Sequence, residues 1–494
     1  MAILSADEEH RDRAVYLFES ILLSWVHSNP AYRGVHYISA MECGLRLIAV
    51  CQAVDLIRPY LTQPDTIWPA VVSLVNSHAS FIVHRLSLYS SSGNHTIAEC
   101  AGLVYAGTLF PELSGAGRWK NVGLTLLQKE VGRQFLADGG GVEQAFGYQL
   151  FITDLANLVA RLLASRNSVS MALEQSVAAS MTFLGQLFDE NWTLPNIGDN
   201  DGGYALNPNL RISHTRCLPT QKILSYATSG YSLIRDENKS DRLLIFDHGE
   251  LGMPPSYGHG HSDCLSLYWR ENGEPLLIDP GTFTYTGDAR WRAYFRGVTA
   301  HNTVSVDRQD QAKQQGAFMW SQPFDVALMQ INGPIDGHGV IIANHSGYMR
   351  FGIRHYRALI YNPEGKLMVW DFLKQSGENA QRHELSLWWH MSGTVDSDEV
   401  HEGCYLLRGE KGICFRLETS GGEIFRYSAD ETNPQGWDSP VYGQKIKATT
   451  IEVRQTTHTS HNFYTYVAST TEAIRLEEKA AFASVVQTLR PICK

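Results

Sequence analysis

Apolar residues recur at every third or fourth position through roughly the first two-fifths of the chain. Such spacing gathers apolar side chains on one face of an α-helix. Seven segments carry it, separated by short breakers rich in Ser, Asn, Pro and Gly: residues 9–26, 39–57, 67–86, 96–110, 118–137, 144–164 and 168–188. We therefore predict a helical domain over residues 1–195, built from antiparallel helical hairpins.

The pattern changes near residue 195, where a polar loop rich in Gly, Asn and Asp begins. From about residue 220 onward, short runs with strand character follow one another, and Asn272-Gly273 between two of them is a strong hairpin signal. No long helical pattern interrupts these runs. The sequence therefore predicts a large antiparallel β-sandwich over residues 220–494, which gives an α+β multidomain fold with a binding cleft expected between the two domains.

Composition narrows the class of protein. The chain has 494 residues, 44% hydrophobic and 19% charged, with a net charge of −10, which argues against nucleic acid as a partner. A polyanionic ligand would need a local basic patch. The sequence has no unbroken run of about 18 apolar residues, so we expect no membrane span. The N-terminus does not look like a signal peptide. The eight cysteines are scattered, so we expect mostly buried free thiols.

A His-x-His pair stands at the head of the predicted hairpin. We predict that His259 and His261 lie on one strand, where alternation points both rings to one face. If Asn272-Gly273 is the turn, the returning strand brings Asp279 alongside. His301 begins a later strand. Two imidazoles and a carboxylate suit a zinc-like ion, so His261, Asp279 and His301 are candidate ligands, with Asp263 as a competing ligand or a group that orients a ring. The alternative is that Asp279 caps a turn and His301 bonds a loop.

The helical half offers a second group. Asn94 and His95 stand at the mouth of a helix, with Glu99 one turn further along the same face as His95. Their plain interpretation is a helix cap and a solvated face.

Two other segments carry candidate chemistry. Tyr148, in "GGGVEQAFGYQLF", would ordinarily be a core-edge residue of its helix. Asp199 and Asp201, in "IGDNDGGY", could bind a cation or sugar hydroxyls, or simply form turns. Phosphate-loop, nucleophile-elbow and dinucleotide motifs do not occur in convincing form.

In order and character, these stretches resemble the heparinase II/III-like polysaccharide lyases. The Asn-His helix, the tyrosine segment and the block "GHGHSDCLSLYWRENGEPLLIDPGTFTYTGDARWRAYFRGVTAHNTVSVD" carry the likeness, which covers roughly residues 30 to 310. The resemblance implies an (α/α) helical toroid followed by a β-sandwich. Little precedes the helix at 39–57, so we expect the toroid to be incomplete.

The resemblance also implies an activity, the β-elimination of a uronic-acid-containing polysaccharide such as a glycosaminoglycan or alginate-like polymer. Asn94 and His95 would hold the uronate carboxylate, Tyr148 would act as acid or as both acid and base, and His259 would be the opposing base or acid.

The remaining implied roles concern metal and substrate. His261, Asp279 and His301 would hold a structural metal, expected to be zinc. Glu99, Arg292 and Arg296 would bind substrate, although surface salt bridging is an equal alternative for the two arginines.

Three hypotheses about the function follow. The first is the lyase, for which the family implies a periplasmic or secreted location, although the missing signal peptide keeps the cytoplasm open. The second is a metal-dependent hydrolase with an open metal position. The third is a non-catalytic, glycan-binding family member that serves exopolysaccharide assembly.

Overall fold

The structure is a computed structural model of the chain and describes residues 7–89, 91–207, 215–217, 223–235, 242–329, 333–362, 364–376 and 381–493. The chain forms two compact units. The first comprises Met1–Leu136, Leu150–Met181 and Gly203–His214, and the second comprises Ala137–Gln149, Thr182–Gly202 and Thr215–Lys494. The predicted domains 1–195 and 220–494 stay a prediction, and positions 1, 220 and 494 lie outside the described residues.

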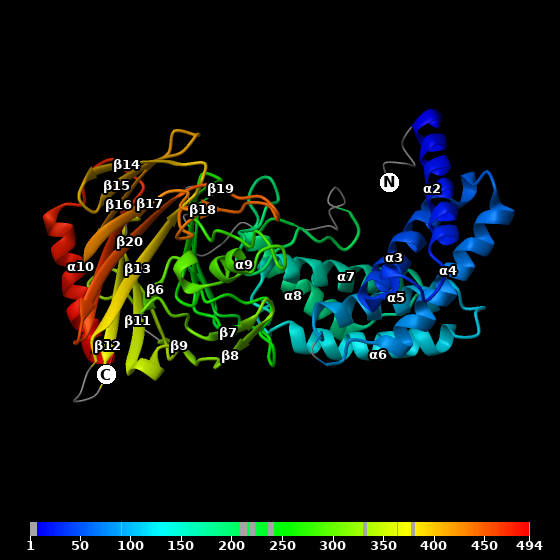
Figure 1. Ribbon diagram of the computed structural model, residues 1–494, viewed down its shortest axis with the longest axis horizontal. Helices are drawn as coiled ribbons and strands as arrows, with labels where there is room; N and C mark the ends of the chain where they lie inside the picture. The colour runs from blue at the N-terminus through cyan, green and yellow to red at the C-terminus, as the bar shows by residue number, and fades with distance from the viewer. Residues whose placement is uncertain are drawn as a thin grey trace. The chain divides into compact units, whose positions relative to one another are not determined.

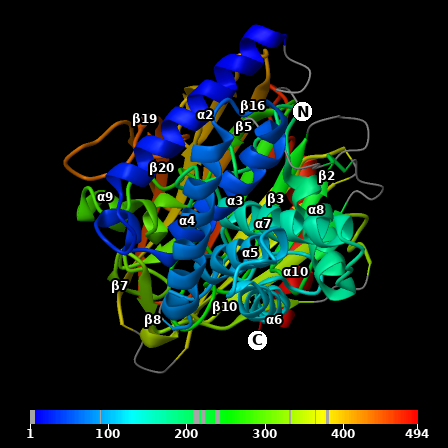
Figure 2. The same ribbon diagram turned by 90° about the vertical axis from the view of Figure 1, so that its right-hand side faces the viewer.

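The first unit is helical (Figure 1, Figure 2). Helices α7 and α8 contribute to both units. The helices of the N-terminal half are α2 (Glu8–Ser28), α3 (Ala40–Ile57), α4 (Pro64–Arg85), α5 (Asn94–Leu109), α6 (Ala116–Gln134), α7 (Phe146–Ser165) and α8 (Met171–Leu187). Each of the seven predicted helical segments corresponds to one of them. Buried apolar residues such as Leu47, Val71, Leu103 and Leu127 form a shared core, as the apolar spacing requires.

Helix α4 is the one helix in the described part of the chain that could cross a membrane by length and composition. Half of its most apolar window is buried inside the protein, and a core helix passes the same test. Val71 and Leu74 on α4 belong to the core of the first unit. The helix is therefore only a weak indication of a membrane span.

The second unit is a sandwich of two antiparallel sheets, which confirms the predicted fold class. In spatial order, the first sheet contains β1 (Ile223–Tyr226), β2 (Tyr231–Arg235), β3 (Leu243–Asp247), β4 (Leu267–Glu271), β5 (Glu274–Leu277), β13 (His383–Met391), β20 (Thr449–Thr457) and β17 (Glu423–Tyr427), with β6 (Val304–Val306) beside β13. The second sheet contains β14 (Asp396–His401), β15 (Cys404–Arg408), β16 (Cys414–Ser420), β21 (His461–Ala468), β12 (Leu367–Gln375), β11 (Ile353–Tyr361), β10 (Gly339–His345) and β9 (Val326–Met329).

Smaller elements complete the unit. Two hairpins pair β7 (Lys313–Gly316) with β8 (Met319–Ser321), and β18 (Trp437–Asp438) with β19 (Ile446–Lys447). Two helices are α9 (Ala289–Phe295) and α10 (Leu476–Leu489), which the sequence did not predict. The 3-10 helices of both units are η1 (Val35–Tyr37), η2 (Arg58–Tyr60), η3 (Val298–Ala300), η4 (Met349–Phe351) and η5 (Arg490–Cys493).

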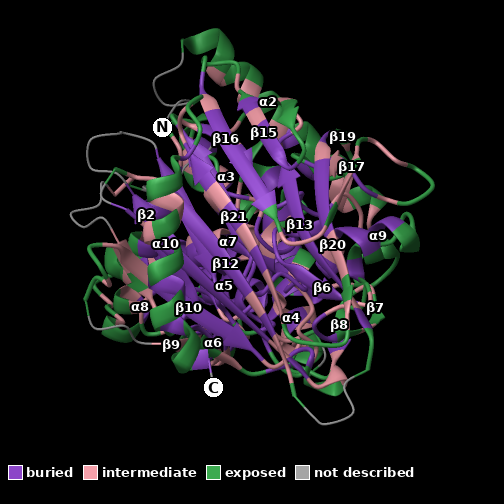
Figure 3. Cartoon of the chain, turned by 90° about the vertical axis from the view of Figure 1, so that its left-hand side faces the viewer, coloured by how far each residue is buried: buried purple, intermediate pink, exposed green. Residues whose placement is uncertain are grey.

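One apolar core lies between the two sheets. Leu387 and Trp389 on β13 belong to the same buried cluster as Val369 on β12 and Phe415 on β16. The alternate residues Met368 and Trp370 of β12 instead pack with Phe482 and Val485 of α10, which covers the outer face of the second sheet (Figure 3). Strand β12 is therefore buried on both faces, which explains its continuous apolar run.

The predicted Asn272-Gly273 turn is confirmed. Both residues have positive φ, 50° and 79°, and they join β4 to β5 where Glu271 pairs with Glu274. This is the backbone that an Asn-Gly hairpin turn adopts. The prediction of free cysteines is also confirmed, since all eight are free and six are buried.

A chain of buried polar side chains runs inside the sandwich. The Gly347 N–H donates to Nδ1 of His345 (3.1 Å), Nε2 of His345 lies 3.2 Å from Nδ1 of His355, and Nε2 of His355 lies 2.7 Å from Oδ1 of Asp371. Burial lowers the pKa of both histidines. Each neutral ring therefore carries its proton on Nε2 and donates toward Asp371.

Arg357 neutralises this chain and ties it to two loops. It donates to both oxygens of Asp371, through Nε (2.6 Å) and Nη2 (2.9 Å). Its Nη1 donates to the carbonyl of Leu265 (2.6 Å) and to that of Asn302. These carbonyls belong to the segments that lead into β4 and β6, so the arginine fixes both segments against the second sheet.

Replacing Arg357 with Gln should lower the free energy of unfolding of the second unit by about 3–5 kcal/mol, because Asp371 would stay buried without its cation. Arg408→Gln is the matched control. Arg408 also pairs with an aspartate on a neighbouring strand of the same sheet, Asp398, but both side chains are exposed. The control should change stability by under about 1 kcal/mol. Urea unfolding followed by tryptophan fluorescence would measure both, and equal losses would contradict the argument.

Candidate active site

A buried carboxylate, Asp199, lies at the centre of the candidate site. Arg292 grips it with two hydrogen bonds, from Nη1 to Oδ1 (2.5 Å) and from Nη2 to Oδ2 (2.7 Å). Two histidines also bond to it, His259 through Nδ1 (3.1 Å to Oδ2) and His261 through Nε2 (2.9 Å to Oδ1). One carboxylate thus holds both members of the His-x-His pair and one of the two arginines.

The Asp199 loop is fixed by backbone contacts on both sides. The Asp199 N–H donates to the His259 carbonyl (3.0 Å), and the Phe146 N–H, at the start of α7, donates to the Ile197 carbonyl (3.1 Å). Between them, Gly198 has φ +69°, and a Cβ there would lie 2.3 Å from the Gln144 carbonyl. Only glycine allows this approach. The loop therefore sits against the first turn of α7, which carries Tyr148.

The prediction that His259 and His261 lie on a strand is wrong. Both are in an irregular segment, and β4 begins only at Leu267. The residue between them is Gly260, where a Cβ would lie 1.7 Å from the Leu251 carbonyl. Close backbone packing, rather than strand alternation, therefore sets the direction of the two rings.

Tyr148 and His259 are stacked, with ring centroids 3.9 Å apart and planes at 22°. The Tyr148 hydroxyl lies 3.0 Å from the Tyr285 hydroxyl and donates to Oδ2 of Asp201 over 3.4 Å. Tyr148, His259 and Tyr285 are each half-buried, while Asp201 is exposed. The three side chains are therefore neighbours at the surface of the second unit, with two phenol groups beside one imidazole.

The charges around this group oppose the effect of burial. Burial alone would raise the pKa of Asp199, but the Arg292 charge and the hydrogen bonds of His259, His261 and Arg292 hold it well below its usual range. Burial lowers the pKa of His259, but its bond to Asp199 and the charges of Glu143 and Asp199 outweigh that effect and raise the pKa above its ordinary value. Burial, then the charge of Asp201, raises the pKa of Tyr148, so its phenol stays protonated at neutral pH.

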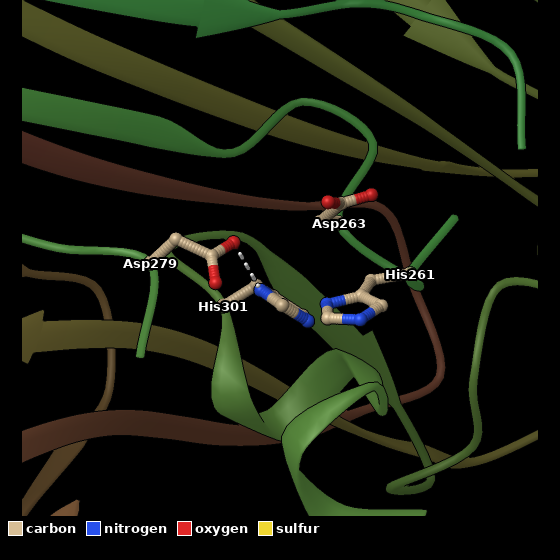
Figure 4. Close-up of side chains that lie close together, drawn as sticks. All are labelled: His261, Asp263, Asp279 and His301. Carbon is tan, nitrogen blue, oxygen red and sulfur yellow. Dashed lines mark hydrogen bonds and ion pairs between the residues drawn. The ribbon is translucent and has the colours of Figure 1, made fainter. Parts of the chain in front are cut away.

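A second cluster lies on the other side of His261. His261, Asp263, Asp279 and His301 each present a ligand-type atom within 4.8 Å of the others (Figure 4). The His261 and His301 rings lie 5.3 Å apart between centroids. Nδ1 of His301 bonds Oδ2 of Asp279 (2.9 Å), and Oδ1 of Asp279 accepts the Gly281 N–H (3.1 Å). Asp279 therefore does both things that the sequence offered as alternatives: one of its oxygens caps the turn, and the other contacts His301.

Two ring nitrogens in this cluster lack partners. Among the described residues, Nδ1 of His261 and Nε2 of His301 are buried and make no hydrogen bond. Buried imidazole nitrogens are normally satisfied. A small cavity of about 10 Å³ has Asp263 and Asp279 of this cluster among its lining residues, together with Asp247. Unpaired nitrogens next to several buried carboxylates are a donor set that fits a cation.

The predicted residues of the first unit, Asn94, His95 and Glu99, all lie on α5. Asn94 is buried at the start of α5, and His95 is half-buried. Glu99 is not on a solvated face: it is fully buried and accepts hydrogen bonds from the Ser87 N–H (2.8 Å) and the Ser87 hydroxyl (2.7 Å). In the structure Glu99 therefore anchors the segment before α5, and its predicted contact with substrate stays a prediction.

The two arginines are buried rather than on the surface, so surface salt bridging is wrong for both. Arg292 also donates to the Ala317 carbonyl from Nε (2.9 Å) and Nη2 (2.8 Å). Arg296 donates to the carbonyls of Gly316 and Ala317 (2.7 Å each) and lies 4.3 Å from the Trp320 ring centroid. Their substrate role stays a prediction, while in the structure both hold the β7–β8 hairpin.

Sequence reasoning did not assign the roles of Asp199 and Tyr285. Asp199 was seen only as one of two acidic residues in a Gly-rich loop, and its partners lie 60 to 93 positions away. Tyr285 follows the Asp279-Pro280-Gly281 turn, and nothing in its local pattern distinguishes it. The only sequence signal for Asp199 was the density of Gly, Asn and Asp in its loop.

The helical unit, the antiparallel sandwich and the tyrosine–histidine pair beside a histidine–carboxylate cluster define a class of α+β protein. Comparison with known families is consistent with this class. The family model for the heparinase II/III N-terminus matches residues 5–201, and the model for the heparinase II/III-like C-terminal region matches residues 219–477. The chain belongs to the heparinase II/III family.

Individual relatives are distant. A heparin-sulfate lyase of Bacteroides stercoris is 21% identical over 401 residues, covering 76% of this chain and 56% of the relative. An alginate lyase of Stenotrophomonas maltophilia is 24% identical over 176 residues, covering 34% of this chain and 23% of the relative. The chain thus spans about half the length of the first of these curated relatives. A crystal structure of heparinase III shares the fold, with a TM-score of 0.73 at 16% identity over 95% of this chain and 75% of that chain.

Replacing Arg292 with Gln should destabilise the second unit by about 3–5 kcal/mol, because Asp199 would lose this guanidinium while remaining buried. Arg290→Gln, two residues earlier on α9 and exposed, is the matched control and should cost under about 1 kcal/mol. Chemical denaturation would measure both. An Arg292 variant as stable as the control would show that the Asp199 charge does not depend on this pair.

Proposed function

We propose that this chain is a polysaccharide lyase that cleaves a uronic-acid-containing polysaccharide by β-elimination. The observation that carries the proposal is the stacked Tyr148–His259 pair, which combines a protonated phenol with an imidazole held by a buried carboxylate. Family membership supports it, and so do the names of the relatives, a heparin-sulfate lyase and an alginate lyase. An acidic polysaccharide is therefore the substrate class.

The reaction needs three functions. A base removes the weakly acidic proton at C5, next to the uronate carboxylate, and the electron pair forms the C4–C5 double bond. The C4–O bond breaks, and an acid protonates the leaving glycosidic oxygen. A third group stabilises the negative charge that builds up on the carboxylate. No water is consumed, and one product carries an unsaturated uronate.

We assign the base to His259. Its Nδ1–H donates to the ionised Asp199, so the neutral ring has its lone pair on Nε2. A carboxylate that fixes the tautomer and stabilises the imidazolium formed after proton transfer is the arrangement found in other His–Asp pairs. His259 gains the C5 proton and returns it to solvent after the products leave.

We assign the acid to Tyr148. Burial keeps its phenol protonated, and the stacking places it against the base. The Tyr285 hydroxyl, 3.0 Å away, can donate to the Tyr148 oxygen as it gives up its proton. Tyr285 thus lowers the cost of forming the phenolate, which solvent then reprotonates.

We assign the binding of the substrate's uronate carboxylate to Asn94 and His95, as the family resemblance implies. An amide N–H and an imidazole N–H at the first turn of a helix are donors suited to a carboxylate. We further propose that the chain acts outside the cytoplasm, where such polymers occur, which cell fractionation would test.

We propose that His261, Asp279 and His301 hold a zinc ion, with Asp263 as a fourth ligand or as a group that orients the others. The two unpaired imidazole nitrogens and the grouping of the four side chains support this set. Zinc enclosed by four protein groups has no open position for a substrate, which favours a structural ion over the hydrolase alternative. When bound, the ion would cross-link the segments that carry these residues.

Wild-type protein incubated with a panel of acidic polysaccharides should produce ultraviolet absorbance in the band of the unsaturated uronate with at least one polymer. Tyr148→Phe should reduce the rate by about 10²–10⁴-fold, because it removes the proton donor but keeps the ring. Tyr16→Phe, on the exposed face of α2, should retain the wild-type rate.

Full activity of Tyr148→Phe would refute the acid assignment. A flat trace with every polymer, from folded protein, would refute the lyase proposal. Binding of one of the same polymers without turnover would then favour the non-catalytic, glycan-binding function.

Purified wild-type protein should contain about one zinc ion per chain by elemental mass spectrometry, and His261→Ala or His301→Ala should lose it, because each removes a ligand. His401→Ala, an exposed histidine on β14, should keep the wild-type content. Chelation should also lower the unfolding temperature of the wild type but not of the two ligand variants. A wild type that takes up no zinc in titration would contradict the site.

A further inference from the structure

Three aromatic side chains form a continuous group beside the Tyr148–His259 pair, here called the aromatic rim: Tyr285, Phe318 and Tyr442. The Tyr285 ring centroid lies 4.9 Å from that of Phe318 and 5.1 Å from that of Tyr442. Phe318 in turn lies 6.0 Å from His259. The rim therefore begins at the proposed base and extends away from it.

The rim is exposed although its rings are large. Phe318 is 40% exposed and Tyr442 is 36% exposed, while Tyr285 is half-buried. None of the three belongs to the core of the sandwich. Several aromatic rings in contact with one another and with solvent are the usual mark of a binding surface rather than of packing.

Phe318 is held out by a rigid hairpin. It occupies the tip between β7 and β8, where the neighbouring Ala317 carbonyl accepts hydrogen bonds from both Arg292 and Arg296. The Trp320 N–H donates to the Ser256 carbonyl (2.9 Å). Two buried arginines therefore fix the backbone on which Phe318 is displayed, so the ring is ordered before a ligand arrives.

Tyr442 is built into the same surface from a distant part of the chain. It lies in the loop between β18 and β19, and its hydroxyl accepts the Tyr285 N–H (3.0 Å). The Gly443 N–H donates to the Phe283 carbonyl (2.8 Å). The loop is thus tied to the segment that carries Tyr285, and through Tyr285 to the hydroxyl of Tyr148.

A buried cation backs the rim. The Arg292 guanidinium carbon lies 5.0 Å from the Tyr285 ring centroid and 5.3 Å from that of Phe318. The same guanidinium pairs with Asp199. Because a cation over an aromatic ring is attracted to its π electrons, Arg292 holds both rings from the protein side.

We propose that the aromatic rim is a sugar-stacking subsite that receives a pyranose ring of the polysaccharide next to the unit undergoing elimination. The inference rests on the proposed function and adds its nearest binding subsite. A pyranose presents a face of C–H groups, which packs on the electron-rich face of an aromatic ring, while its hydroxyl, carboxylate and sulfate groups stay at the edge. Such a surface suits a sugar ring in an acidic polymer without requiring a free positive charge.

The rim should therefore contribute the same binding free energy to the bound substrate as to the transition state. Removing it should raise KM and leave kcat nearly unchanged. Phe318→Ala should raise KM about 10-fold, the loss of one well-packed aromatic contact, with kcat changed by less than about 3-fold. Phe318→Tyr, which keeps a ring, should stay near the wild type.

Met319→Ala is the matched control. Met319 is the next residue on the same hairpin and is 50% exposed, but it is not one of the rim's rings. Tyr442→Ala should raise KM as Phe318→Ala does. Tyr442→Phe keeps the ring, so KM should stay near the wild-type value.

The experiment is steady-state kinetics on a polymer that the wild type cleaves, together with calorimetric titration of the same polymer into each variant in the Tyr148→Phe background. KM and Kd that rise for Phe318→Ala and Tyr442→Ala, but not for Met319→Ala, would support the subsite. Values within about 2-fold of the control for both alanine variants would overturn it. If the wild type cleaves no polymer, the proposed lyase activity fails, and the titration alone decides whether the rim binds glycan.

Discussion

The site depends on one buried negative charge. Asp199 has no exposed surface, and a carboxylate in that position is stable only if it is neutralised and fully hydrogen-bonded. Arg292 supplies the neutralising positive charge and donates two hydrogen bonds to the carboxylate. His259 and His261 fill the remaining acceptor positions of Asp199. His259 and His261 are bonded to Asp199 directly. Tyr148 is stacked on His259, and the other proposed metal ligands are grouped around His261.

The same carboxylate gives the two histidines different tasks. His259 bonds Asp199 through Nδ1, so its Nε2 is the nitrogen left for chemistry, whereas His261 bonds through Nε2, so its Nδ1 is left facing His301. Because Gly260 packs against the Leu251 carbonyl, the segment cannot shift to exchange these roles. Two adjacent imidazoles thus serve a proton-transfer site and a metal-type cluster without competing for one position.

Elements with a strong repeating pattern could be predicted from the sequence, and the site geometry could not. The spacing of apolar residues located α2 to α8, and Asn272-Gly273 located the turn between β4 and β5, because local propensity decides both. The grouping of His261, Asp279 and His301 also agrees with the predicted set. The strand assignment of His259 and His261 was wrong, since an irregular segment leaves no periodic signature. Asp199 and Tyr285 became meaningful only through partners far along the chain. Helix α10 was missed although its buried Phe482, Val485, Val486 and Leu489 follow helical spacing.

A site on irregular segments can still be rigid if their buried carbonyl groups have strong donors. Here arginines provide them: Arg357 donates to the carbonyls of Leu265 and Asn302, next to the metal-type cluster, and Arg292 and Arg296 donate to the carbonyl of Ala317, below the aromatic rim. A guanidinium has five N–H groups, so one side chain can neutralise a buried carboxylate and fix a loop together. The buried arginines thus do for these segments what the hydrogen bonds of a sheet do for a strand. This explains how functional side chains can leave the strands of the sandwich and keep a defined geometry.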